Sequence, residues 1–154
     1  PRIDKDLIVK FRQDLIATTG NLYGEVPNLI LNVGEHQAEQ AFLWWLEQFG
    51  EDFYVELIRH GLPEEDRVND VLLEFAEKYD VKPVASNDVY YLNKKDSPAH
   101  DVLLCVKDGK SMSMEVGPGR RKRYALPNDQ YYFKSQEEMN ELFSDIPAAA
   151  SAPR

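Results

Sequence analysis

Short stretches of strand character alternate with amphipathic helical patterns along this 154-residue chain, and this alternation most constrains its fold. The expected strands are residues 15–18, 53–58 and 83–86, and each is followed by a turn and then by a helix. Strands that alternate with helices pair in parallel through right-handed crossovers. The pattern therefore predicts the α/β class. Three strands cannot close a barrel, so either further residues complete the sheet or the segment is an unusually small layer, and we favour the first.

Two long helices are predicted from apolar residues at positions i, i+3, i+4 and i+7. This spacing runs from Ala38 to Phe49 and again from Val68 to Tyr79. A shorter amphipathic run covers residues 3–11. We therefore expect each of the two long helices to bury one face.

Two further helices are predicted from their start signals. Asp96-Ser97-Pro98, a cap residue with a first-turn proline, precedes a helix over residues 99–106. Ser135 with Glu138 forms a capping box ahead of the other helix. Residues 107–124 show little periodicity and are expected to form a long loop, and the small residues of 148–154 are expected to be a frayed tail.

The composition narrows the range of functions. With 18 Lys and Arg against 27 Asp and Glu, the net charge of −9 argues against a surface that binds nucleic acid throughout. The single cysteine, Cys105, excludes an internal disulfide and a cysteine-built zinc site, and it fits a reducing, cytoplasmic location. No stretch approaches the roughly 18 apolar residues of a membrane span, so no membrane partner is expected. Because the chain begins at Pro1 rather than Met, we expect a piece of a longer protein.

Polar residues follow the predicted strands, where parallel α/β sheets bind their ligands. They are Thr19, Arg59, His60, Asn87 and Asp88. His60 and Asp88 have the chemistry of metal ligands or of an acid–base pair. Polar residues at strand ends also satisfy turn backbone and cap helices. From the residues alone, a strand-end site and ordinary turn chemistry both remain open.

A basic run is the local exception to the acidic average. Arg120, Arg121, Lys122 and Arg123 lie in the glycine-flanked part of the predicted loop. Four cations there can contact phosphate, an acidic neighbouring domain or water. Tyr124 beside them has a ring that can stack on a base, but a tyrosine after a loop more often re-enters the core. We expect a solvated loop or a domain contact rather than nucleic-acid binding.

Four segments carry a resemblance to a known family. They are residues 53–63 with Arg59-His60-Gly61, residues 84–92 with Asn87-Asp88-Val89-Tyr90, and residues 96–106 and 133–147. Together they resemble the alpha subunit of bacterial DNA polymerase III, in the second half of its N-terminal polymerase-and-histidinol-phosphatase (PHP) domain. Gly24-Glu25-Val26-Pro27 sits where that family carries a similar turn. The resemblance implies a role in DNA replication and a partial, distorted (β/α) barrel of PHP type over residues 1–147, of which this chain supplies the later strands only.

The resemblance also points to a metal site that has lost ligands. Working relatives of the domain bind a metal cluster and can hydrolyse phosphoester bonds, with proofreading as the proposed role. The corresponding ligand positions here are Asn21, Asp88 and Tyr90, where the family pattern has a cysteine, an aspartate and a histidine. Asparagine is a poor zinc ligand and tyrosine an uncommon one. We therefore expect no cofactor, with Asp88 as a remnant ligand in a non-catalytic scaffold or interaction part.

Two alternatives stay open beside this interpretation. One is a metal-dependent phosphoesterase or proofreading exonuclease, completed by a preceding half that supplies ligands for Zn, Mn or Mg. The other is a stand-alone acidic protein-binding module. In the favoured interpretation the parent chain is a DNA-directed DNA polymerase, a nucleotidyltransferase. The partners of this segment are then the rest of the alpha subunit and other replisome subunits, and DNA binds the parent chain rather than this segment alone.

Overall fold

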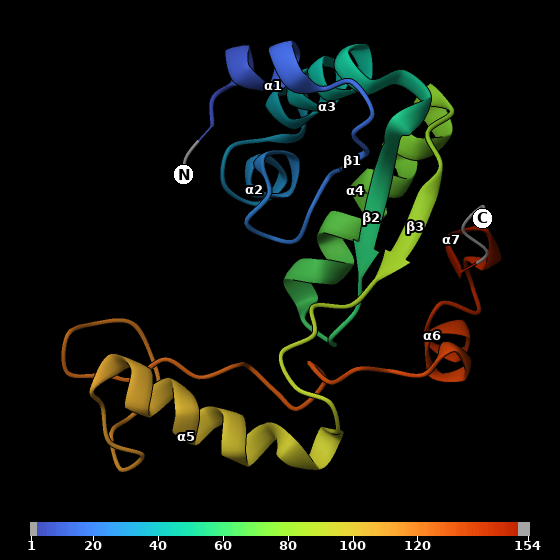
Figure 1. Cartoon of the computed structure of the whole chain (residues 1–154). Coiled ribbons are helices and arrows are strands. Elements are labelled where there is room, and N and C mark those ends of the chain that lie inside the picture. The colour runs from blue at the N-terminus through green and yellow to red at the C-terminus, as the bar shows by residue number, and fades with distance from the viewer. Residues whose placement is uncertain (1–2, 151–154) are drawn as a thin grey trace. The chain divides into compact units, whose positions relative to one another are not determined.

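The computed structural model describes residues 3–150, which divide into two compact units (Figure 1). Unit 1 contains the described residues up to Ser86 together with those from Met139 onward. Unit 2 contains Asn87–Glu138. Unit 2 is therefore an insertion in the sequence of unit 1, and each unit is described by itself below.

Unit 1 is built on a parallel sheet of three strands in the order β1-β2-β3. The strands are β1 (Ala17–Thr18), β2 (Phe53–Ile58) and β3 (Pro83–Ser86). Ala17 lies opposite Phe53 in the first pair, and Val55 lies opposite Pro83 in the second. The predicted α/β class and parallel pairing are confirmed, and β2 is the central strand.

Helices surround this sheet in unit 1 (Figure 1). Their bounds are α1 (Lys5–Phe11), α2 (Glu25–Asn32), α3 (Glu35–Phe49), α4 (Pro63–Tyr79), α6 (Gln136–Leu142) and α7 (Pro147–Ala150), and a 3-10 turn over Gly50–Asp52 joins α3 to β2. Helix α6 begins in unit 2 and ends in unit 1. Within unit 1, α4 packs along β2, α2 packs against α3, and α7 lies beside β3.

The core of unit 1 lies between α3, α4 and β2. The ring of Phe42 on α3 is 5.1 Å from Phe53 on β2, and 5.4 Å from Phe75 and 5.9 Å from Tyr79 on α4, between ring centroids. The apolar positions from which α3 and α4 were predicted are buried or packed against this core. Burial of this periodic face, rather than helix propensity alone, stabilises both helices.

Helix α2 was not predicted from the sequence. Its third residue is Pro27, which is tolerated because the first-turn N–H groups of a helix have no intrahelical acceptor. Gly24 precedes the helix and approaches the backbone closely, since a Cβ atom there would lie 2.3 Å from the Thr19 carbonyl oxygen. The family-like Gly24-to-Pro27 segment is thus a helix start packed against the end of β1.

Unit 2 has one long helix, α5 (Ser97–Asp108), which follows a 3-10 turn over Lys94–Asp96. The predicted cap residue Asp96 does not cap α5 with its side chain, because its carboxylate accepts hydrogen bonds from the main-chain and side-chain nitrogens of Asn93. Cys105 is buried on α5, and its thiol contacts the Met112 sulfur at 3.4 Å. Cys105 is therefore a thiol packed within unit 2.

The predicted loop begins two residues later than expected, because α5 continues through Asp108. From Gly109 to Tyr124 the chain has no helix or sheet strand, and an isolated bridge joins Val116 to Arg123. At the other end of the chain, residues 148–150 belong to α7 rather than to a frayed tail, and Ala149 is buried. Residues 151–154 lie outside the described residues. No helix within residues 3–150 has the length and apolar character needed to cross a membrane.

Candidate functional site

Thr19 continues the hydrogen bonding of the sheet beyond the end of β1. Its main-chain N–H donates to the Tyr54 carbonyl oxygen at 3.1 Å, and its hydroxyl accepts from the Glu56 N–H at 2.9 Å. The side chain is buried. Two residues on, the Asn21 side-chain oxygen accepts from the Tyr23 N–H at 3.1 Å, which is ordinary turn chemistry. Both residues that the sequence placed at this strand end therefore stabilise the local backbone.

His60 at the end of β2 pairs with Glu65 in the first turn of α4. The Glu65 carboxylate lies 2.7 Å from the His60 ring nitrogen Nδ1 and accepts from the His60 main-chain N–H at 2.6 Å. It also accepts from the Leu62 N–H at 3.3 Å, so it caps α4 from within. The two residues are 2% and 4% exposed. One buried carboxylate thus ties the β2–α4 turn to the start of the helix.

Glu65 is a residue that the sequence analysis did not single out. Glu64, Glu65 and Asp66 together matched the preference of a helix N-terminus for anions, which explains exposed carboxylates as readily as buried ones. The sequence carried one weak signal, a glutamate at the third helical position, where it can reach back to the main chain before the helix. That signal does not identify the imidazole as its second partner.

The polar groups around the turn between β2 and α4 leave little room for a ligand. Asn69 on α4 donates from its side-chain nitrogen to the Ile58 carbonyl oxygen at 2.9 Å. Between the Gly20-to-Leu22 turn and α4 there is a hollow of about 10 Å³. A space of that size holds about one water molecule at most.

Arg59 extends from the end of β2 to the C-terminal segment of unit 1. Its guanidinium donates to both carboxylate oxygens of Asp145 at 2.6 and 2.7 Å and to the Leu142 carbonyl oxygen at 2.8 Å. It also lies 4.9 Å from the ring of Phe143. The hydrogen-bonded ion pair raises the pKa of Arg59 and lowers that of Asp145. Thr19, Arg59 and His60 therefore have three separate sets of partners within unit 1.

The remaining strand-end residues belong to unit 2. Asn87 donates from its side-chain nitrogen to the Tyr132 carbonyl oxygen at 2.9 Å and accepts from the Lys134 ammonium at 3.0 Å. The Tyr90 N–H donates to the Tyr131 carbonyl oxygen at 2.9 Å, and its ring contacts those of Tyr131 and His100. Asp88 lies between these residues in the sequence and also belongs to unit 2.

The side chains at the three positions where the resemblance predicts ligands do not fit a catalytic metal cluster. Asn21 offers an amide already engaged in a turn, and Tyr90 offers a phenol, so Asp88 alone brings a strong anionic ligand. The imidazole of His60, in unit 1, has its Nδ1 atom on Glu65. Among residues 3–150 no group of three His, Cys, Asp or Glu side chains is arranged to hold a metal ion.

Two of the four cations in the basic run form ion pairs within unit 2. Arg123 is buried and donates to Asp101 on α5 at 2.5 Å and to the Met114 carbonyl oxygen at 3.1 Å. The hydrogen bond to Asp101 raises the pKa of Arg123. Lys122 pairs with Glu115 at 3.1 Å. The four predicted cations are therefore not an equivalent set, because Arg123 serves as an anchor for the loop.

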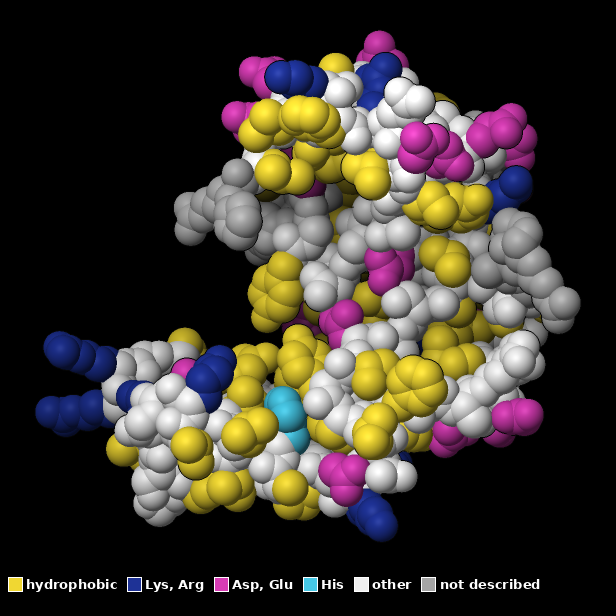
Figure 2. Space-filling model, viewed as in Figure 1, with side chains coloured by type: hydrophobic (Ala, Val, Ile, Leu, Met, Phe, Trp, Pro, Cys, Tyr) yellow, Lys and Arg dark blue, Asp and Glu magenta, His cyan; other side chains and the backbone are white. Residues whose placement is uncertain are grey.

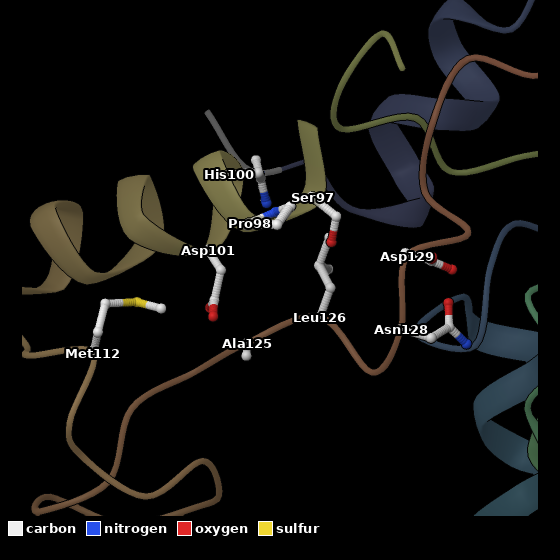
Figure 3. Close-up of a pocket in the computed structure, with 9 residues that line it drawn as sticks. All are labelled: Ser97, Pro98, His100, Asp101, Met112, Ala125, Leu126, Asn128 and Asp129. Carbon is white, nitrogen blue, oxygen red and sulfur yellow. The ribbon is translucent and has the colours of Figure 1, made fainter. Parts of the chain in front are cut away.

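Unit 2 also contains a pocket of about 340 Å³, lined by both polar and apolar residues, which the sequence did not predict. Figure 3 shows that it lies between α5, which supplies His100 and Asp101, and the segment that carries Ala125 to Asp129. Asp101 points from the helix toward that segment. Its carboxylate is neutralised by Arg123, which precedes the segment in the chain. Asp129 lies 3.7 Å from the Lys94 ammonium. The two carboxylates that line the pocket, Asp101 and Asp129, are thus both paired within the unit.

Comparison with known proteins finds one matching family model and several similar sequences. The model of the PHP domain matches residues 1–60. Over 149 residues, 97% of this chain, the sequence is 40% identical to the DNA polymerase III subunit alpha of Borreliella burgdorferi. It is 38% identical over 145 residues to that of Thermus aquaticus and 36% identical over 149 residues to that of Haemophilus influenzae. The chain spans 11–12% of the length of these relatives.

Residues 1–60 are thus similar to the PHP domain, and they lie in a unit built of parallel strands that alternate with helices. Nearly the whole chain is homologous to a segment of the alpha subunit of DNA polymerase III. The resemblance found in the sequence is confirmed.

Proposed function

We propose that this chain is a structural and interaction part of a replicative DNA polymerase, and that it does not itself hydrolyse phosphoester bonds. One observation carries the proposal: the polar residues at the ends of β1 and β2 are used to stabilise the fold. Thr19 accepts from the main chain, Arg59 binds Asp145, and His60 binds Glu65. A hydrolytic centre needs such groups directed at a substrate or a metal.

The losses at the family's ligand positions support the same conclusion. Changes in residues that merely orient metal ligands already cost about 10- to 100-fold in affinity or activity. An amide at position 21 and a phenol at position 90 remove two ligands outright. Asp88 is the one feature that favours the rival function, a phosphoesterase or exonuclease whose other ligands come from a preceding segment.

Metal content tests this proposal. The purified chain is incubated with zinc or manganese, desalted and examined by elemental analysis, and we expect well under one equivalent of metal. The Asp88→Asn variant is the matched control, because it removes the remaining carboxylate without changing the size of the side chain. A full equivalent of metal in the original chain that disappears in Asp88→Asn would overturn the proposal.

We also propose that the sheet is part of a distorted barrel completed by preceding strands. Beside β1 there is an apolar groove of about 460 Å³ between α1 and α3, lined by Phe11, Leu15, Ile16, Trp45 and Phe49 among others. Phe11, Leu15 and Ile16 are largely exposed. β1 lies at one end of the strand order, and an unpaired edge beside an apolar surface is the arrangement expected where another strand joins.

The proposed partners follow from the homologues. The rest of the alpha subunit is the first partner, and other replisome subunits are candidates for the remaining surface. The parent chain would carry the DNA-directed polymerase activity and bind DNA, whereas this segment would not bind DNA usefully alone. The pairing of Lys122 and Arg123 with Glu115 and Asp101 supports that view, because it engages two of the four cations of the basic run.

A further inference from the structure

Helix α5 has one side that packs within unit 2 and another side that exposes aliphatic side chains. On one side Cys105 is buried and Asp101 binds Arg123, so this face is covered by the loop of unit 2. On the other side Val102, Leu103 and Val106 are 47%, 62% and 72% exposed. With the exposed Ala99 they occupy positions i, i+3, i+4 and i+7, which form one continuous stripe along a helix. We call these four residues the α5 stripe.

The α5 stripe is an unusual feature for a surface helix. Single exposed apolar residues are common, but a helical row of them marks an interaction surface. Within unit 2, α5 packs through the side of the helix that lies opposite the stripe. The stripe therefore contributes nothing evident to the packing of unit 2.

Cations border the stripe in the chain at both of its ends. Lys94 and Lys95 precede α5, and Lys107 lies in its last turn, followed by Lys110. All but Lys110 are exposed, although Lys94 lies 3.7 Å from Asp129 and Lys107 lies 3.6 Å from Asp108 in ion pairs at the surface. Figure 2 shows Lys and Arg side chains projecting at the end of unit 2 that carries the basic loop. Unit 2 has nine Lys and Arg against eight Asp and Glu, whereas the rest of the chain has nine against 19.

We propose that the α5 stripe docks into an aliphatic groove of another protein surface that is bordered by carboxylates. Aliphatic side chains at i, i+3, i+4 and i+7 are the anchors by which a helix occupies such a groove. The lysines at both ends would meet acidic residues at the rim and set the orientation. This inference rests on the proposed function and deepens it, because it names a surface through which the chain would bind a partner.

Other occupants fit the stripe less well. The four stripe residues include no aromatic ring, and single-stranded nucleic acid is held largely by stacking on such rings. Helices that lie on membranes usually insert Trp, Phe or Leu from a broad apolar face. Here the stripe is narrow and carries a single Leu. A protein groove matches both the aliphatic spacing and the terminal cations.

Two synthetic amphipathic peptides of about 18 residues test this inference by fluorescence anisotropy. Both have leucine at i, i+3, i+4 and i+7. One carries Glu on both sides of the leucine row, and the other carries Lys at the same positions. We expect the intact 154-residue chain to bind the acidic peptide at least ten times more tightly than the basic one. The affinity for the acidic peptide should fall as salt is raised, because its charges are screened.

Matched variants show which surface is used. Leu103→Gln with Val106→Gln should weaken binding of the acidic peptide at least tenfold, since glutamine keeps the helix but removes the anchors. Val33→Gln, an exposed apolar residue of unit 1, is the control and should change nothing. Lys95→Glu with Lys107→Glu should weaken binding and abolish the preference for the acidic peptide. Lys10→Glu with Lys82→Glu is the control, because it makes the same change of charge in unit 1, and it should leave the preference for the acidic peptide unchanged. Circular dichroism confirms that each variant is folded.

Several results would overturn the inference. Equal binding of the two peptides would show that charge does not define the partner, and no binding, or binding unchanged in Leu103→Gln with Val106→Gln, would show that the stripe is not the site. Vesicles of anionic lipid that bind the chain through the stripe would make the occupant a membrane. Self-association of the chain that the same variant abolishes would make the occupant a second copy.

Discussion

The buried Glu65 is expected to contribute more to stability than any exposed carboxylate of the chain. Glu65→Ala leaves three groups without their acceptor, namely the His60 N–H, the His60 ring and the Leu62 N–H. Hydrogen bonds to charged groups contribute about 1.5–3 kcal/mol each, and removing one partner of a buried pair costs about 3–5 kcal/mol. We therefore expect Glu65→Ala to lower the free energy of unfolding by about 3–5 kcal/mol, a large share of the roughly 5–15 kcal/mol that a domain has.

Urea unfolding followed by tryptophan fluorescence measures this loss. The signal reports on unit 1, which contains Glu65, because Trp44 and Trp45 both lie on α3 of that unit. Glu64→Ala is the control: this exposed neighbour has the same helix-end position and should cost only about 0.3–1 kcal/mol. If Glu65→Ala does not fold, Glu65→Gln replaces it, since the amide keeps the shape and one acceptor and should give an intermediate loss. A Glu65→Ala loss within about 1 kcal/mol of the Glu64→Ala loss would refute the reasoning from burial.

Three further predictions concern other contacts. Asp145→Asn should lower the free energy of unfolding at neutral pH by about 1 kcal/mol or less, because Asp145 is mostly exposed. Arg59 lowers the pKa of Asp145, so this difference should be present above the unfolded pKa and vanish as the pH falls through the folded pKa; a difference that persists in acid would contradict the ion pair. Tyr132, which donates to Glu138, has its pKa raised to about 12, and Glu138→Gln should lower that pKa in an ultraviolet titration read against Tyr132→Phe. Lengthening the chain upstream should raise its unfolding midpoint by covering the groove beside β1, and equal midpoints would argue against a split barrel.

The sheet and the long helices were predictable because their signals are local. β2 and β3 have the bounds that the sequence indicated, and the buried face of α4 follows the helical spacing of its apolar residues. The capping box of Ser135 and Glu138 is present, with both hydrogen bonds formed. Each of these features depends on residues a few positions apart.

The polar contacts were not predictable for the opposite reason. Arg59 meets Asp145 across 86 positions, and Arg123 meets Asp101 across 22. No periodicity or spacing marks which two distant charges will meet, because the fold decides it. Strand-end residues therefore suggested a site in the sequence, whereas the structure shows them engaged with partners that the sequence could not name. Helix α2 was missed for a local reason, since a proline near its start indicates a turn as readily as a helix.

The insertion of unit 2 has a consequence for how the protein is made. Phe143 is fully buried in the core of unit 1, and Arg59 binds Asp145, so unit 1 is incomplete until residues beyond 138 have been synthesised. At about 5–20 residues per second, a ribosome needs roughly 3–10 s to translate unit 2 before that segment emerges. During this delay the nascent sheet would expose the surface that Phe143 later covers. Unit 2 can therefore fold before unit 1 is complete. During this delay the exposed early part of unit 1 is the part of the chain that most needs a chaperone.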